Sequence, residues 1–256
     1  MADADLERNP ETLESPDGAR VAGLADYLSS DDGKAPPPPI RGGRLLRLLP
    51  RRAPSLYRAL GTRAMRPAGR RQFAKAHAGG PVRLHLGCGW VRKEGWLNVD
   101  LFATRADVYW DLALGIPLPD SSVEAVFHEH MLEHLTLQSG FMFTRECHRV
   151  LKPGSVLRIG VPDAGALLDS YSGKGDPEWA NSRPTGMLAV QALFYENGHL
   201  AMYDSETLIL MCRAAGFAEA TQRMSGEGLL QPSPDTPSRE SGTLYVEARK
   251  RSLTTS

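Results

Sequence analysis

From Pro81 onward, short apolar segments alternate with segments of helical periodicity, and this alternation restricts the possible folds more than any other feature of the chain. Short apolar runs that are bounded by turn residues are typical of buried strands. Strands that alternate with helices predict an α/β fold with a Rossmann-like, doubly wound sheet. The predicted strands are residues 82–86, 96–101, 106–111, 122–128, 155–161, 217–223 and 243–249.

Two segments show the periodicity of a helix with one apolar face. In residues 139–151 apolar side chains recur at helical spacing, and residues 152–154 (Lys-Pro-Gly) are expected to end the helix and turn the chain into the next strand. Residues 204–215 show the same periodicity, and Gly216 stands where a left-handed C-terminal cap is needed. Between these helices, residues 164–200 are rich in Gly, Pro and Asn. We interpret them as an insertion that forms a lid or a substrate-binding segment.

The first eighty residues differ from the rest in charge, which predicts a separate unit. Residues 1–32 carry nine acidic side chains, and residues 1–40 end in four consecutive prolines, so we expect a disordered, acidic and Pro-rich tail. Residues 41–75 carry ten arginines and one lysine but no acidic residue. Prolines divide residues 41–80 into what we expect to be an Arg-rich arm of short helices. The alternating strands and helices after residue 80 are expected to form the main domain, residues 81–250.

The Arg-rich arm has three possible roles. It could cap the following domain with its apolar faces, contact an anionic membrane surface through residues 41–75, or bind nucleic acid, which is the least favoured of the three. The N-terminus lacks the apolar core of a secretory signal, and the three cysteines, Cys88, Cys147 and Cys212, show no disulfide or zinc-ligand spacing. These features favour a cytoplasmic protein, with peripheral membrane contact through the arm as an option.

A glycine pair follows the first predicted strand of the main domain. Gly87, Cys88 and Gly89 come at the carboxyl end of that strand, where a doubly wound sheet binds nucleotide-like ligands. Asp100 ends the next strand, and an acidic side chain there can accept hydrogen bonds from both hydroxyls of a ribose. A dinucleotide site is disfavoured, because Arg92 replaces the third glycine of the fingerprint and Asp100 follows too soon.

Taken in order, several segments resemble the successive motifs of class I S-adenosylmethionine-dependent methyltransferases. They are LHLGCGW and GWLNVD, WDL and IPLPDSSVEAVFHEHMLEHL, ECHRVLKPGSVLRIGVPD, and GHLAMYDSETL with AAGF. The resemblance covers residues 81–250 and is greatest to bacterial members with a shortened first helix, several of which act in surface-polysaccharide pathways. It implies a seven-stranded sheet whose last strand is antiparallel and lies between the fifth and the sixth. It also implies S-adenosyl-L-methionine as the cofactor.

The resemblance also implies roles for individual residues and for the chain as a whole. The implied cofactor contacts are Gly87, Cys88 and Gly89 at the methionine part, Asp100 with Leu101 at the ribose, Asp111 and Leu112 at the adenine, and His128 and Glu129 near the sulfonium. The implied activity is methyl transfer, which we expect to act on an oxygen of a sugar, a glycan precursor or another small molecule. One alternative is metal-assisted O-methylation of RNA ends or a phenolic substrate. Another is a catalytically inactive methyltransferase-like module that binds partners.

The segment HEHMLEHL, residues 128–135, contains the H-x-x-E-H pattern of some zinc peptidases. On a helix that started near His130, the side chains of His130, Glu133 and His134 would share one face. A peptidase would need that helix at the centre of its fold, whereas here the segment follows a strand in the middle of a sheet. We therefore reject the peptidase interpretation.

Three roles remain open for this segment. His130, Glu133 and His134, together with His199, are the candidate catalytic residues, with His130 as a base or polar contact to the acceptor. Alternatively they hold a divalent metal, which His199 could help to ligate only if the insertion folds back. In the third interpretation they only support neighbouring loops. We assign no residue to a metal from the sequence.

Overall fold

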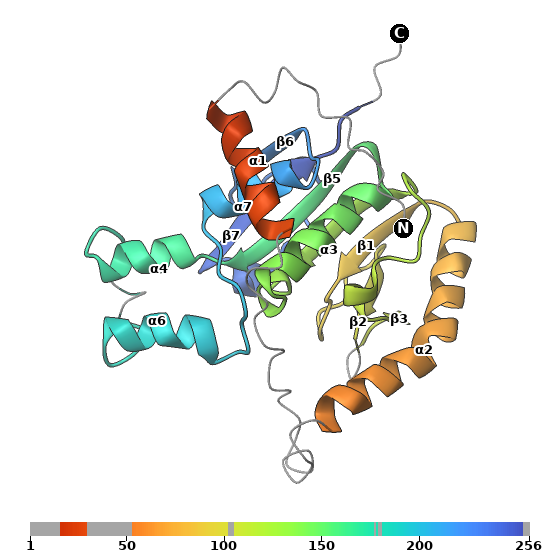
Figure 1. Cartoon of the computed structure of the whole chain (residues 1–256), viewed down its shortest axis with the longest axis horizontal. Coiled ribbons are helices and arrows are strands. Elements are labelled where there is room, and N and C mark those ends of the chain that lie inside the picture. The colour runs from red at the N-terminus through yellow and green to blue at the C-terminus, as the bar shows by residue number, and fades with distance from the viewer. Residues whose placement is uncertain (1–15, 30–52, 102–104, 177, 179–180, 253–256) are drawn as a thin grey trace.

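Seven strands form one mixed sheet in the order β3-β2-β1-β4-β5-β7-β6 (Figure 1). The structure is a computed structural model that describes residues 16–29, 53–101, 105–176, 178 and 181–252. The strands are β1 (Val82–Leu86), β2 (Leu97–Asp100), β3 (Val108–Tyr109), β4 (Val123–Glu129), β5 (Leu151–Pro162), β6 (Glu219–Arg223) and β7 (Thr243–Arg249). All seven predicted strands are therefore confirmed.

The last strand reverses the direction of the sheet. β1 to β5 pair in parallel, whereas β7 is antiparallel to both β5 and β6 and lies between them. This arrangement confirms the predicted Rossmann-like sheet with an inserted antiparallel last strand. The carboxyl ends of the parallel strands meet at one edge, and the start of β7 joins them there, as the pairing of Pro162 with Thr243 shows.

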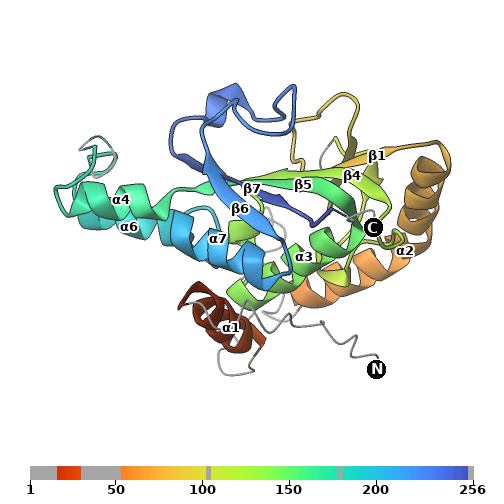
Figure 2. The same cartoon turned by 90° about the horizontal axis from the view of Figure 1, so that it is seen from above.

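Helices cover one face of the sheet, and loops cover much of the other (Figure 2). The helical face carries α3 (Leu137–Val150), α7 (Ser205–Ala214) and α1 (Pro16–Ser29). On the other face, Trp96 packs its ring against Phe127 of β4, and Arg158 of β5 pairs with Asp235 from the loop between β6 and β7. Side chains that alternate along β4 and β5 therefore enter two different environments.

The described part of the Arg-rich arm, residues 53–80, contains one helix rather than several short ones. α2 (Ala53–Ala78) runs through Pro67 without interruption, although an interior proline costs about 3 kcal/mol. Packing against Trp110 explains why the part of α2 after Pro67 stays helical. Phe73 is fully buried against Trp110, and a Cβ on Gly69 would come within 2.8 Å of the same indole ring. The part of α2 after Pro67 thus caps the domain beside β3. Membrane contact through residues 41–75 stays a prediction.

The predicted disorder of residues 1–40 is wrong for residues 16–29. α1 lies on α7, where Leu28 is buried and Arg20 pairs with Glu206. Residues 1–15 and 30–52, including the proline run, lie outside the described residues. No helix among the described residues combines the length and apolar content needed to cross a membrane.

The predicted turn at residues 152–154 belongs to a strand. α3 ends at Val150, and β5 begins at Leu151 without an intervening loop. Gly154 absorbs the change of direction with a φ of +79°, while its N–H donates to the carbonyl of Lys250. The strand pairing supplies the hydrogen bonds that a turn would otherwise have to make.

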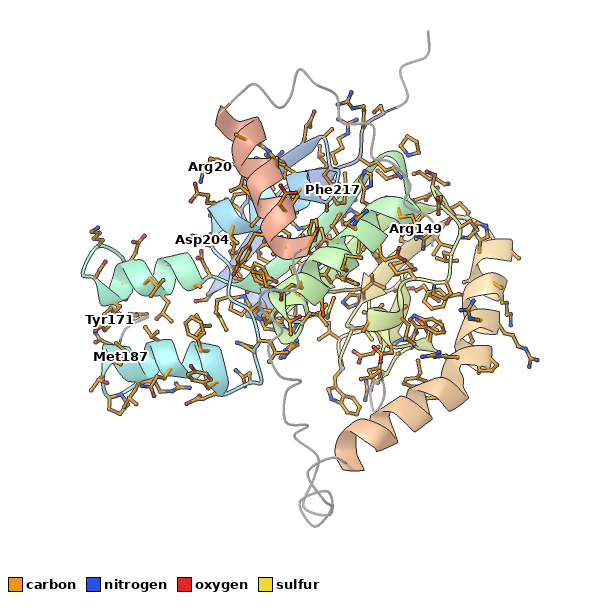
Figure 3. The ribbon with its side chains drawn as sticks, viewed as in Figure 1. Arg20, Arg149, Tyr171, Met187, Asp204 and Phe217 are labelled. Carbon is orange, nitrogen blue, oxygen red and sulfur yellow. The ribbon has the colours of Figure 1, made fainter. Side chains whose placement is uncertain are left out.

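The insertion after β5 forms a helical pair that projects from the domain. α4 (Ala164–Tyr171) runs away from the sheet and α6 (Gly186–Tyr195) returns to it, so Tyr171 and Met187 lie at the end farthest from the sheet (Figure 3). Asp163 caps α4 by accepting a hydrogen bond from the N–H of Ala166 at 2.9 Å. The carboxylate of Asp163 is therefore used to begin this helix.

Candidate functional site

The loop after β1 is shaped by two glycines in left-handed conformations. Gly87 and Gly89 have φ values of +68° and +54°, and the N–H groups of Gly87 and Cys88 both donate to the carbonyl of Val99. A Cβ on Gly87 would lie 2.2 Å from Cγ of Met131, so only glycine fits there. A Cβ on Gly89 would meet nothing described within 4 Å. The loop is therefore packed behind Gly87 and open in front of Gly89.

Asp100 lies directly beside this open position. Its carboxylate accepts hydrogen bonds from the N–H groups of Gly89 and Leu101, each at 2.6 Å. An ionised carboxylate has about four lone-pair sites, so two further donors can bind it. The predicted group Gly87, Gly89, Asp100 and Leu101 is thus brought together, with capacity left for a ligand that carries two hydroxyls.

The segment after β3 joins the same edge of the sheet. The N–H of Trp110 donates to the carbonyl of Asp100 at 2.8 Å, which places the following residue next to the end of β2. Asp111 then caps the 3₁₀ helix η3 (Leu112–Leu114), and Leu112 packs against the core. Both predicted adenine contacts follow the strand by two or three residues instead of ending it.

Cys88 is not suited to nucleophilic chemistry. Its thiol is buried, and burial, followed by the charges of Asp100 and Asp107, raises its pKa to about 11. Because the thiolate is the reactive form, the side chain stays an inert thiol near neutral pH. Its predicted role as a neighbour of the cofactor remains a prediction.

The prediction that His128 lines the cofactor pocket is wrong. Its ring is fully buried on the helical face of the sheet, where it makes an edge contact with Phe143 of α3. Burial, with a smaller contribution from His85, lowers the pKa of His128 to about 3, so the ring is neutral. Adjacent residues of a strand point to opposite faces, so His128 and Glu129 cannot share a pocket.

Glu129 holds the loop-covered face together. Its carboxylate accepts hydrogen bonds from the hydroxyl of Tyr245 at 2.7 Å and the N–H of Thr236 at 3.1 Å, and it lies 3.4 Å from Nη1 of Arg239. Burial and the bond to Glu129 raise the pKa of Tyr245. All these partners come from the loop before β7 or from β7 itself, so Glu129 fixes this loop to β4 rather than lining an open pocket.

The residues after β4 form a tight turn and not the helix that the H-x-x-E-H spacing would require. His130 has a φ of +54°, and the 3₁₀ helix η4 (Leu132–His134) follows it, with α3 beginning only at Leu137. The ring of His130 contacts Oγ1 of Thr243 through Nε2 at 2.9 Å and lies 3.3 Å from Oε1 of Glu133 through Nδ1. Both ring nitrogens therefore face protein groups, so contact with an acceptor would require one of them to change partner.

The insertion does fold back onto this turn. The N–H groups of Leu200 and Ala201 donate to the carbonyl of Glu133 at 2.7 and 3.2 Å. His199 thereby approaches His134, with ring centroids 5.1 Å apart. The structure thus brings together all four predicted catalytic residues, although His134 and His199 belong to different segments.

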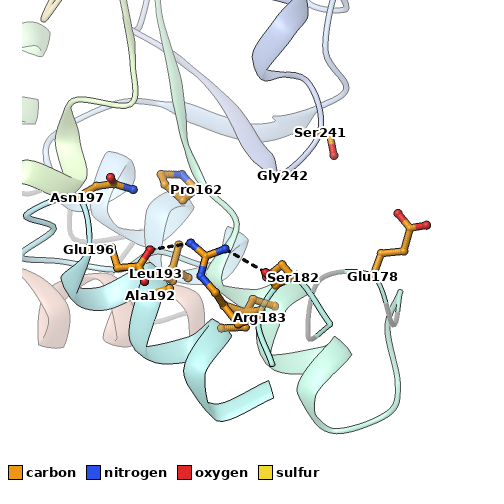
Figure 4. A pocket seen from close by; sticks show the side chains of 12 residues that line it. Pro162, Glu178, Ser182, Arg183, Ala192, Leu193, Glu196, Asn197, Ser241 and Gly242 are labelled. Carbon is orange, nitrogen blue, oxygen red and sulfur yellow. Dashed lines mark hydrogen bonds and ion pairs between the residues drawn. The ribbon is translucent and has the colours of Figure 1, made fainter. Parts of the chain in front are cut away.

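A cavity of about 390 Å³ lies between the insertion and the ends of β5 and β7 (Figure 4). Its lining includes Pro162 at the end of β5 and Gly242 just before β7, together with polar residues from the insertion. Arg183 pairs with Glu196 at 2.6 Å and also donates to the carbonyl of Ser182. Sequence reasoning identified the insertion but not these residues. Nothing in the sequence marked them, because residues 176–197 are no richer in charged side chains than the rest of the chain.

Two comparisons of the sequence find methyltransferases. The profile of the methyltransferase domain family matches residues 106–159, from β3 to β5. A curated relative from Mycolicibacterium smegmatis, described as a probable S-adenosylmethionine-dependent methyltransferase, is 39% identical over 59 residues. That match covers 23% of this chain and 22% of the relative, so the two are similar over about a fifth of their lengths.

Two solved structures show a more distant likeness. A SAM-dependent methyltransferase from Archaeoglobus fulgidus is 17% identical with a TM-score of 0.45, covering 75% of this chain and 94% of that one. A 1,6-didemethyltoxoflavin-N1-methyltransferase from Burkholderia thailandensis is 15% identical with a TM-score of 0.40, covering 83% and 94%. The predicted resemblance to class I methyltransferases is confirmed by the family match over residues 106–159 and by the sheet order.

Proposed function

We propose that this chain, which has the sheet order of a class I methyltransferase, binds S-adenosyl-L-methionine and transfers its methyl group to an oxygen of a small polar acceptor. The observation that carries the proposal is the carboxylate of Asp100 beside Gly89. It offers free lone pairs at the carboxyl end of β2, next to a loop that is open in front of Gly89. These features fit the ribose hydroxyls and the adjoining chain of the cofactor.

The arrangement at the turn after β4 connects the two halves of the proposed site. Met131 packs behind Gly87 of the cofactor loop, while the preceding His130 contacts Thr243, the neighbour of cavity-lining Gly242. An acceptor in the cavity and a cofactor at the glycine loop would therefore lie on either side of one short turn. Alignment of the two reactants is the main requirement for methyl transfer.

The bound cofactor supplies a methyl group that its sulfonium already makes electrophilic. Gly89 and Asp100 would hold the cofactor, which would supply this methyl group to the acceptor oxygen. The protein has to bind, orient and exclude water. The cavity suits a hydroxyl-rich acceptor such as a sugar or glycan precursor, because Arg183, Glu196 and Asn197 offer both hydrogen-bond donors and acceptors.

Calorimetric titration with S-adenosyl-L-methionine tests the cofactor half of the proposal. Gly89→Arg fills the open side of the loop, and Asp100→Ala removes the predicted ribose acceptor, so both variants are expected to lose binding. Glu94→Ala is the matched control, because Glu94 is an exposed acid in the same loop. Absence of binding by the folded wild-type protein, or equal binding by all four proteins, would contradict the proposal.

Transfer itself is tested with cofactor that carries a labelled methyl group. The full chain is incubated with a cell extract, and products are identified by mass spectrometry. We expect label on a hydroxyl-bearing small molecule or glycan precursor, and none with Asp100→Ala. Label on nitrogen, carbon or nucleic acid would contradict the acceptor assignment but not the cofactor assignment.

A further inference from the structure

Three potential metal ligands from two separate segments meet at the turn after β4. Glu133 and His134 belong to η4, and His199 belongs to the stretch between α6 and α7. One ligand atom from each lies within 4.8 Å of the others. Zinc–ligand bonds of about 2.0–2.2 Å hold the ligand atoms of one site roughly 3–4 Å apart, so small side-chain rotations would bring these atoms to that spacing.

The buried carboxylate of Glu133 lacks hydrogen-bond donors. Its side chain is fully buried, and among the described residues neither oxygen has a hydrogen-bond partner. The nearest nitrogen in an ion-pair contact is Nδ1 of His130, 3.3 Å from Oε1. A buried carboxylate without hydrogen bonds is strongly unfavourable unless a cation neutralises it. The group that would satisfy Glu133 is therefore a cation placed between it and the two other ligands.

Both histidines have a backbone carbonyl next to one ring nitrogen, which leaves the other nitrogen available to a metal. Nδ1 of His199 lies 2.5 Å from the carbonyl of Leu193, and Nδ1 of His134 lies 3.4 Å from the carbonyl of Gly198. A carbonyl can only accept, so each Nδ1 is the donor, and in the neutral ring the lone pair is on Nε2. Metal-ligating histidines commonly donate their second nitrogen to a backbone carbonyl, which fixes the ring. These bonds orient both rings before any ion arrives.

We propose that Glu133, His134 and His199 bind one divalent transition-metal ion of the zinc class. Two imidazoles and one carboxylate suit such ions, whereas magnesium and calcium prefer oxygen ligands alone. Three protein ligands leave at least one position for water or a substrate oxygen. The ion would fasten the insertion to the turn after β4, two residues from the cavity-lining Asn197. The site would exist whether or not the chain transfers methyl groups.

Metal binding is measured directly, with cobalt as the probe. The untagged full chain is stripped with a chelator and titrated with Co²⁺, whose visible absorption reports nitrogen and oxygen coordination. We expect one ion per chain, displacement by Zn²⁺ and a higher melting temperature with metal. Loss of an outer partner weakens metal binding by about 10- to 100-fold, so loss of a direct ligand in His199→Asn should weaken it by at least about 100-fold.

The variants separate a metal site from a purely structural cluster. Glu133→Gln keeps the shape of the buried side chain, and His199→Asn changes only the less buried insertion, so at least one variant should fold. His77→Ala removes an exposed histidine from α2 and should bind like the wild type. Absence of stoichiometric Co²⁺ binding by folded wild-type protein, or unchanged binding in His199→Asn, would overturn the proposal. Gly89→Arg should retain the metal while losing cofactor, so failure of either function is recognised separately.

Discussion

The guanidinium of Arg158 and the carboxylate of Asp235 form a buried ion pair that joins β5, an interior strand of the sheet, to the loop between β6 and β7. Nε of Arg158 lies 2.6 Å from Oδ1 of Asp235, and the two side chains are 0% and 4% exposed. Glu247 of β7 approaches the same guanidinium at 3.2 Å. One arginine therefore balances two buried acids, and the loop that covers this face of the sheet depends on it.

Replacing Arg158 by Met should destabilise the protein severely, because it leaves Asp235 buried without its counter-charge and removes the nearer of the two arginines that pair with Glu247. Breaking a buried ion pair in this way costs about 3–5 kcal/mol, which chemical denaturation followed by circular dichroism measures. The control is Arg83→Met, which removes an exposed arginine that lies over Trp96; it should cost less than about 1 kcal/mol. Equal losses in both variants would show that the buried pair is not the anchor.

The sequence predicted the sheet well because its strands are short apolar runs between turn residues, a local pattern that the packing did not override. It predicted short helices at residues 53–78 and disorder at 16–29 because Pro67 and the acidic composition are local signals too. The stabilising contacts of those helices, Phe73 on Trp110 and Leu28 on α7, are tertiary and leave little trace in the local sequence.

The candidate site shows the same division. Asp100 and Gly89 could be paired from the sequence because parallel strands end at one edge, so consecutive strand ends meet. The partners of Glu129 could not, because they depend on how the antiparallel β7 is registered beside β5. The position of His128 does follow from the sequence, since alternation along β4 sends the side chains of His128 and Glu129 to opposite faces of the sheet.

Gly87→Ala should cost more stability than the same change at Gly95. Both glycines have positive φ values, +68° and +76°, which by themselves cost an alanine about 1–2 kcal/mol. Only at Gly87 would the new Cβ overlap Met131, at 2.2 Å from Cγ, whereas at Gly95 it would meet nothing described within 4 Å. Overpacking of this kind adds about 1–3 kcal/mol. Denaturation curves of the two variants give the difference, and identical values would show that Met131 moves aside freely.

Stability should fall as the pH is lowered from 6.5, and His128 should contribute much of the decline. The pKa of His128 is lowered to about 3 in the folded protein. Below pH 6.5 the ring therefore binds a proton in the unfolded chain but not in the folded protein, which lowers the free energy of unfolding. His85 and His148, both lowered to about 4, act in the same direction.

His128→Phe removes one of these buried titratable rings while keeping an aromatic group against Phe143. Between pH 7 and pH 5 it should reduce the loss of unfolding free energy by about 2 kcal/mol, since one pKa unit corresponds to 1.36 kcal/mol. His77→Ala, at an exposed position, should leave the pH dependence unchanged. The measurement is urea denaturation at both pH values. A wild-type decline in His128→Phe would mean that the ring is not held neutral by burial.

Arg183→Leu should separate acceptor binding from cofactor binding. Arg183 lines the cavity and pairs with Glu196 on the protein surface, far along the chain from the glycine loop. If the cavity holds the acceptor, losing this charged donor should lower labelled methyl incorporation by roughly 10- to 100-fold, as the loss of a charged hydrogen bond does. Calorimetric affinity for S-adenosyl-L-methionine should stay at the wild-type value, and Arg83→Met should leave both quantities unchanged. Wild-type incorporation by Arg183→Leu would place the acceptor outside this cavity, whereas a parallel loss of cofactor affinity would mean that the insertion also shapes the cofactor site.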